Sequence, residues 1–162
     1  MKFEVRHTFA VPPETLWEAL LDPKMEEKMT AMSQSTREIV EERSDEASTY
    51  RRVRIHSSNP AFAAVAKLLG SATVTFEHET TAHHAARRVD WRFLPPPGLT
   101  QIAMAGSFTV GPHAEGSERV AAGQVDVKLP LVGKTIEGKI IDAMKAMYDK
   151  GAAVRRDAFS RG

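Results

Sequence analysis

Cysteine is absent from this sequence of 162 residues. Disulfide bonds, thiolate metal sites and cysteine nucleophiles are therefore excluded. An excess of one charge sign is lacking as well, because 22 basic residues stand against 21 acidic ones and leave a net charge of +1. A chain so nearly neutral has no broad basic surface of the kind that binds nucleic acid, and we expect no nucleic-acid partner.

A long hydrophobic run is also missing. The first residues, MKFEVRHTF, carry charges at Lys2, Glu4 and Arg6, where a signal peptide would be apolar. The longest uncharged stretch, 93–114, is broken by Pro95–Pro97 and by several glycines. It therefore cannot form a membrane-spanning helix. We expect a cytoplasmic protein without an integral membrane segment, for which transient contact with a membrane surface stays open.

The residues that are present predict a mixed α and β structure. The chain is 42% hydrophobic and 27% charged, and its length suits a single domain, 1–162, with a substantial core. Apolar and polar residues alternate in 3–9, 74–78, 89–93, 102–108 and 119–129, which is typical of half-buried strands. Two short helices are predicted after the first strand, and one long helix of about 28 residues, about 42 Å, after Pro130.

The segment 34–56 reads as a hairpin with opposite charges on its two arms. The first arm carries Glu38, Glu41 and Glu42, and the second carries Arg51, Arg52 and Arg54. Opposed charges across a hairpin stabilise it by roughly 0.2–1 kcal/mol per pair. We interpret Arg51–Arg54 as a solvated, salt-bridged face of the sheet.

An apolar segment interrupts the strands at Asn59–Gly70, NPAFAAVAKLLG, in which the only charge is Lys67. A helix that is apolar nearly all round must be buried or must face an apolar partner. It can complete the core, it can serve as a lid over a cavity with Phe62, Val65 and Leu69 facing a ligand, or it can form the interface of a homodimer. The first two uses are compatible.

The order of these elements resembles the START-like, or SRPBCC, superfamily with its helix-grip fold. The resemblance rests on the opening FEVRHTFAVPPETLWEALLDP and on the close VKLPLVGKTIEGKIIDAMKAMYDKG. It implies an α+β fold in which a curved antiparallel sheet wraps around a long C-terminal helix. The stretch NPAFAAVAKLLGSATVTFEHET is similar to PRELI-type phospholipid-transfer proteins, in which an insertion covers the lipid cavity, and to an uncharacterised bacterial START-like family. Basic residues matching those that contact phosphate head groups in the PRELI type are not identified.

A curved sheet and one helix leave a cavity unless large side chains fill it, so we expect a ligand site on their inner faces. The predicted site consists of Val53, Ile55, Phe62, Val65, Leu69, Val74, Phe76, Val89, Trp91, Phe93, Ile102, Met104, Phe108, Ile136, Ile140, Met144 and Met147. Methionines can repack around irregular ligands. His7, His56 and His78 are candidates for the few polar groups that such pockets contain, with a rim or core position as the alternative for each.

Catalytic motifs are weak. Gly133-Lys134-Thr135 resembles the end of a P-loop, but Lys128 stands where the first glycine should be. Adjacent His83 and His84 make a poor metal pair, and no metal or cofactor is expected. The sequence therefore predicts non-catalytic binding or transport of a hydrophobic small molecule, such as a lipid or polyketide. A cyclase or aromatase-type enzyme and a co-chaperone-like protein-binding module are the alternatives.

Overall fold

The computed structural model describes residues 1–68 and 70–161. The first strand and two helices are β1 (Lys2–Phe9), α1 (Pro13–Leu21) and α2 (Pro23–Met32). A hairpin of β2 (Ser35–Ser44) and β3 (Ser48–Ser57) follows, then the short η1 (Pro60–Phe62) and α3 (Ala63–Leu68). The remaining elements are β4 (Val74–His83), β5 (Arg88–Leu94), β6 (Ile102–His113), β7 (Gly116–Val127) and α4 (Gly133–Ser160).

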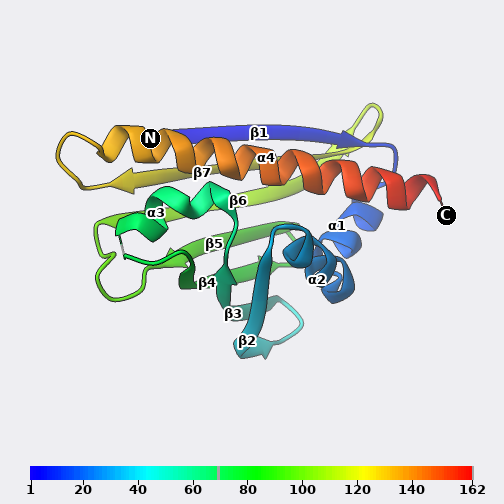
Figure 1. Ribbon diagram of the computed structural model, residues 1–162. Coiled ribbons are helices and arrows are strands. Elements are labelled where there is room, and N and C mark those ends of the chain that lie inside the picture. The colour runs from blue at the N-terminus through cyan, green and yellow to red at the C-terminus, as the bar shows by residue number, and fades with distance from the viewer. Residues whose placement is uncertain (69, 162) are drawn as a thin grey trace.

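All strands form one antiparallel sheet in the order β1-β7-β6-β5-β4-β3-β2. The sheet is curved, and α4 lies lengthwise along it over β1 and β7 (Figure 1). α3 lies beside the first half of α4, and α1 and α2 lie near its second half. The predicted α+β helix-grip architecture is thus confirmed. None of the helices in the described part of the chain has the length and apolar character needed to cross a membrane.

Local sequence explains how the two short helices begin and end. Pro13 occupies the first turn of α1, where a missing N–H costs nothing. α1 stops before Asp22, whose successor Pro23 disfavours a helical conformation at that position. The Asp22 carboxylate then accepts a hydrogen bond from the Lys24 backbone N–H at 3.0 Å and caps α2. This sharp junction lets α1 and α2 close one end of the grip.

Two glycines are paired with each other on the neighbouring strands β6 and β7. Gly106 on β6 is paired with Gly123 on β7 and with Trp91 on β5. A Cβ on Gly106 would contact the Ala122 carbonyl oxygen and would lie 2.7 Å from Trp91 Cζ2. The missing side chain therefore provides the space in which the Trp91 indole lies against the sheet.

The apolar insertion differs in shape from the single helix predicted for 60–69. It begins as a turn of 3-10 helix, η1, and continues as the short helix α3. Val65 and Ala66 are buried in the core, whereas Phe62 is only partly buried and packs against that core. A predicted site residue, Leu69, lies outside the described residues. The segment thus fills one end of the molecule with Val65 and Ala66 and leaves Phe62 at the edge of the core.

Two of the three glycines of α4, Gly138 and Gly151, offer a test of how tightly that helix is packed. An added Cβ at Gly138 would contact nothing within 4 Å, so Gly138→Ala should raise the free energy of unfolding by up to about 1 kcal/mol through helix propensity alone. At Gly151 the Cβ would lie 2.9 Å from Arg155 Nη1 and 3.1 Å from Met29 Cε. We therefore expect a smaller gain from Gly151→Ala. Urea midpoints measure both, and equal gains would show that Arg155 and Met29 move without cost.

Candidate functional site

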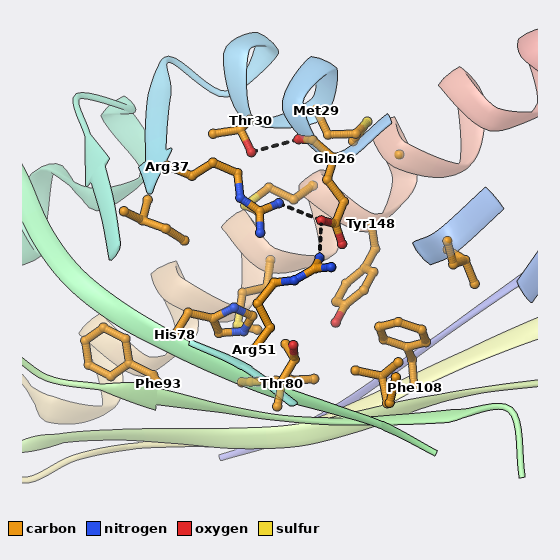
Figure 2. Close-up of a pocket in the computed structure, with 18 of the residues that line it drawn as sticks. Glu26, Met29, Thr30, Arg37, Arg51, His78, Thr80, Phe93, Phe108 and Tyr148 are labelled. Carbon is orange, nitrogen blue, oxygen red and sulfur yellow. Dashed lines mark hydrogen bonds and ion pairs between the residues drawn. The ribbon is translucent and has the colours of Figure 1, made fainter. Parts of the chain in front are cut away.

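A cavity of about 490 Å³ lies between the sheet, α2 and the part of α4 from Ile140 to Arg155. Its size falls within the ordinary range of small-molecule pockets. Figure 2 shows side chains from α2, from α4 and from several strands pointing into it. Most of its lining is apolar, and the polar lining residues come from α2 and the hairpin β2–β3 and also from β4, β7 and α4.

Eleven of the predicted site residues line this cavity. They are Ile55, Phe62, Phe76, Val89, Trp91, Phe93, Met104, Phe108, Ile140, Met144 and Met147. Val65, Val74, Ile102 and Ile136 are instead buried in the core beneath α3 and the first half of α4, where side chains fill the space. Val53 is also buried and does not reach the cavity. The grip is therefore packed solid at the beginning of α4 and hollow further along it.

Three aromatic rings form the wall at the end of the cavity nearest η1. The centroids of Phe62 and Phe76 are 5.7 Å apart, and those of Phe76 and Phe93 are 5.1 Å apart. Tilted contacts at this spacing are favourable beyond simple burial. The row connects the insertion directly to β4 and β5, so a movement of Phe62 would open this end of the cavity.

An ion-pair cluster lies at the opposite wall. Glu26 Oε2 on α2 accepts hydrogen bonds from Arg37 Nη1 on β2 and Arg51 Nη1 on β3, both at 2.9 Å (Figure 2). Arg51 Nε also donates to Glu42 at 2.7 Å. The prediction of a solvated position is therefore wrong for Arg51, because its side chain points to the same, inner side of β3 as Val53 and Ile55. The prediction is confirmed for Arg52 and Arg54, which pair with Glu77 on the outer face.

Two further arginines line the cavity and are almost completely buried, Arg119 at 2% exposure and Arg155 at 8%. Arg119 Nη2 donates to His7 Nδ1 and to the Tyr148 carbonyl, both at 3.1 Å. Arg155 Nη1 donates to the Gly151 carbonyl at 3.3 Å. Burial, together with the charge of Arg155, lowers the pKa of Arg119 to about 10, and burial also lowers the pKa of Arg155. Both groups stay charged at neutral pH.

The three histidines predicted as polar groups of the site occupy different positions in the structure. His78 lines the cavity, next to Trp91 at a centroid distance of 6.2 Å. His7 is buried outside the cavity, where its Nε2 bonds to Asp149 Oδ1 at 2.7 Å. His56 is exposed and bonds to Thr75. His7 therefore holds Arg119 in place rather than contacting the cavity.

The pKa values of His78 and Tyr148, two uncharged groups of the cavity wall, are shifted away from neutral pH. Burial, with a smaller effect from the charge of Arg37, lowers the pKa of His78 to about 4. Burial likewise raises the pKa of Tyr148. At neutral pH the imidazole and the phenol are thus both uncharged, and the arginines carry the charge of the cavity wall together with Glu26.

Sequence reasoning missed most of the polar lining, although the strand and helix periods contained a signal. Arg119 has the same parity along β7 as Val125 and Val127, and Thr80 continues the series of Phe76 and His78 along β4. Arg155 continues the apolar side of α4 beyond Met144 and Tyr148. The other lining residues not predicted are Leu20, Leu21, Glu26, Met29, Thr30, Arg37, Thr49, Arg51, Ala82, Tyr148 and Gly151.

No group of three metal-ligating side chains gathers among the residues that the structure describes. His83 and His84 have separate partners, Asp90 and Thr49. Glu77 and Glu79 lie on the outer face of the sheet, where Glu77 pairs with arginines and Glu79 with Arg92.

Solved structures with this fold come from several sources. The protein TTHA0849 from Thermus thermophilus is 17% identical over 99% of both chains, with a TM-score of 0.68. Ara h 8.0201 is 14% identical over 95% of this chain and 96% of its own, with a TM-score of 0.65. SA2116 from Staphylococcus aureus, a protein of unknown function, is 13% identical over 100% of this chain and 96% of its own, with the same TM-score of 0.65. These likenesses show the fold alone.

Comparison of the sequence itself identifies one family and no curated relative. A search among curated proteins finds no match. The profile of one family, described as protein of unknown function (DUF2505), matches residues 4–157, which is nearly the whole chain. The chain therefore belongs to the DUF2505 family.

Proposed function

We propose that this protein binds or carries a hydrophobic small molecule, a lipid or polyketide-like compound, inside the grip without transforming it. The cavity of about 490 Å³ between the sheet and α4 is the observation that supports this proposal most directly. Its volume is ample for a small ligand, and a mostly apolar wall with a few polar groups is typical of ligand pockets.

The wall is built to adapt to an apolar ligand. The aromatic row of Phe62, Phe76 and Phe93 offers flat, rigid surfaces at one end. Met29, Met104, Met144 and Met147 line the remainder together with aliphatic residues. Unbranched, polarizable methionine side chains can change rotamer to follow ligands of different shape.

The chemistry of the cavity favours binding over catalysis. A general acid or base works best when its pKa lies near the working pH. His78, with a pKa of about 4, is a weak base, and burial makes Tyr148 a weaker acid than usual. Glu26 is held by two arginines. These shifts support a carrier or sensor rather than a cyclase-type enzyme.

The insertion is the proposed lid. Phe62 lies where the insertion meets the cavity, and Val65 and Ala66 after it are buried in the core. A lid of this kind would resemble the insertion of PRELI-type phospholipid-transfer proteins.

Fluorescence can test ligand binding inside the cavity. Trp91 lines the cavity, whereas the other tryptophan, Trp17, is buried in a separate cluster with Leu16 and Leu20. Trp17→Phe would leave Trp91 as the single reporter. We expect a brominated long-chain alcohol to quench Trp91 saturably at micromolar concentration. Absence of saturable quenching, together with no apolar ligand in native mass spectra, would overturn the proposed function.

Phe62→Asp should abolish uptake of the apolar probe, because it places a charge in the aromatic wall. We expect a stability loss of only about 1 kcal/mol, since Phe62 is partly exposed and its removal leaves no closed cavity. Ala63→Asp adds the same charge on the exposed neighbouring residue and should leave uptake unchanged. Unfolding of the Phe62 variant would instead make the segment a fixed part of the core.

A further inference from the structure

The charges around the cavity do not balance. Its lining contains four arginines, Arg37, Arg51, Arg119 and Arg155, and one carboxylate, Glu26. Glu42, just outside the wall, provides a second partner for Arg51. The pair Arg37 and Arg51 is therefore matched by two glutamates, and the surplus positive charge resides on Arg119 and Arg155.

These two guanidinium groups have no carboxylate partner within 4 Å among the described residues. Their Nε atoms are buried and lack any hydrogen-bond partner. The carboxylates whose charge acts on them already have other partners. Asp149, which acts on Arg119, is bonded to His7 and mostly exposed. Glu26, which acts on Arg155, is paired with Arg37 and Arg51. A buried charge without a counter-ion is strongly unfavourable, so such groups are normally paired.

The two arginines are also close together. Arg119 is anchored on the Tyr148 carbonyl and Arg155 on the Gly151 carbonyl. These carbonyls are three residues apart on one helix, which corresponds to about 4.5 Å along its axis. The charge of Arg155 acts on Arg119 and lowers its pKa, as expected for near neighbours. Gly151 leaves the space that the Arg155 guanidinium occupies.

Neighbouring polar groups fix Arg119 rather than neutralise it. Because Nε2 of His7 contacts the Asp149 carboxylate, the ring can carry its proton there and present the Nδ1 lone pair to Arg119. Arg119 also lies over the Tyr148 ring, 5.1 Å from its centroid. Both contacts orient the guanidinium, and neither contributes a negative charge at the arginine.

We propose that the ligand of this cavity is an amphipathic anion, a carboxylate or phosphate group on an apolar tail, whose head group pairs with Arg119 and Arg155. This inference rests on the proposed function and names the ligand class. The tail would run along α4 toward the row of Phe62, Phe76 and Phe93. From Arg155 to Ile140, which lines the other end, α4 extends about 22 Å.

A series of ligands with one tail and different heads tests the proposal. The single-tryptophan Trp17→Phe protein, stripped of bound lipid, is titrated with a brominated fatty acid, an alkyl phosphate, the matching alcohol and the matching trimethylammonium compound. We expect at least one anion to bind about tenfold more tightly than the alcohol, and the cation to bind most weakly. The carboxylate and phosphate arms decide which head group fits. Acetate and inorganic phosphate alone should bind weakly.

Arg155→Met should change two measured quantities in opposite directions, the preference for the anion and the melting temperature. It should remove most of the preference for the anion over the alcohol, and it should raise the melting temperature of the ligand-free protein because an unpaired buried charge disappears. Arg156→Met, on the exposed neighbour that donates to the Thr8 carbonyl, is the matched control and should leave the preference unchanged. Arg155→Lys should retain part of the preference.

The outcomes separate the two proposals. If the alcohol binds as tightly as both anions, the inference fails while the proposed function stands. If no member of the series quenches Trp91, the proposed function fails as well. If Arg155→Met does not fold, Arg155 is a structural residue. Arg155→Lys and Gly151→Ala then test its role, because the first changes the guanidinium and the second places a methyl group 2.9 Å from Arg155 Nη1. Full retention of the anion preference in both variants would overturn the assignment of Arg155 to the head group.

Discussion

Gly106→Ala is expected to destabilise the protein by roughly 3 kcal/mol. The new methyl group would overlap the Ala122 carbonyl oxygen and would lie 2.8 Å from Gly123 Cα and 2.7 Å from Trp91 Cζ2. Two of these neighbours are backbone atoms of the paired strand β7, which cannot move without disturbing the ladder between β6 and β7. The indole would have to leave its place as well, so binding in the cavity should weaken together with stability.

Gly111→Ala is the matched control for this prediction. It lies on the same strand, and its added Cβ would contact nothing within 4 Å. Urea denaturation of both variants measures the difference, and near-UV circular dichroism follows the Trp91 environment. A loss below about 1 kcal/mol for Gly106→Ala would mean that the sheet relaxes around the methyl group and that the tight glycine pairing is not essential.

Acid is expected to weaken the fold through His78. The unfolded chain binds a proton at this histidine below about pH 6.5, whereas the folded protein resists protonation until about pH 4. Between these values the unfolded state binds more protons, so stability falls as the pH falls. Burial is the main cause, the positive Arg37 adds to it, and Glu79 opposes it.

The full shift corresponds to about 3 kcal/mol. We expect roughly 1–3 kcal/mol, because the imidazole keeps partial exposure to the space of the cavity, where water can solvate its charged form. His78→Phe removes the titration. The stability difference between wild type and this variant, measured from neutral pH to about pH 4.5, isolates the histidine from other acid effects. Parallel curves for the two proteins would contradict the prediction.

The architecture could be predicted because its signals are local and repeated. Alternation in 3–9, 74–78 and 89–93 identified the inner face of the sheet, and the four-residue and three-residue spacing after Pro130 identified α4. Strand parity placed Phe76, Trp91 and Phe93 correctly in the cavity wall. Such patterns reflect burial of one face, which the chain records residue by residue.

The charged part of the site was not predicted by the same reasoning, because that reasoning placed Arg51–Arg54 on a solvated face and assigned no role to Arg119 and Arg155. Arg51, Arg119 and Arg155 occupy inward positions. Strand parity for Arg51 and Arg119, and the helical period for Arg155, would have shown this had charge been set aside. Arg51 pairs with Glu26, and Arg155 does not. This difference depends on how α2 lies against β3 and α4, which is a tertiary relation. Likewise, the helical stripe of the insertion assigned Val65 to the site and strand parity assigned Val74, because neither period tells where a core is filled and where it is hollow.

The two unpaired guanidinium groups also bear on how the protein would be maintained in a cell. A folded form that carries them without a counter-ion is less stable than the occupied form, and occupancy shifts the folding equilibrium by mass action. Small changes in folding free energy alter how often quality-control proteases find an open chain. We therefore expect the steady-state amount of this protein to rise and fall with the supply of its ligand.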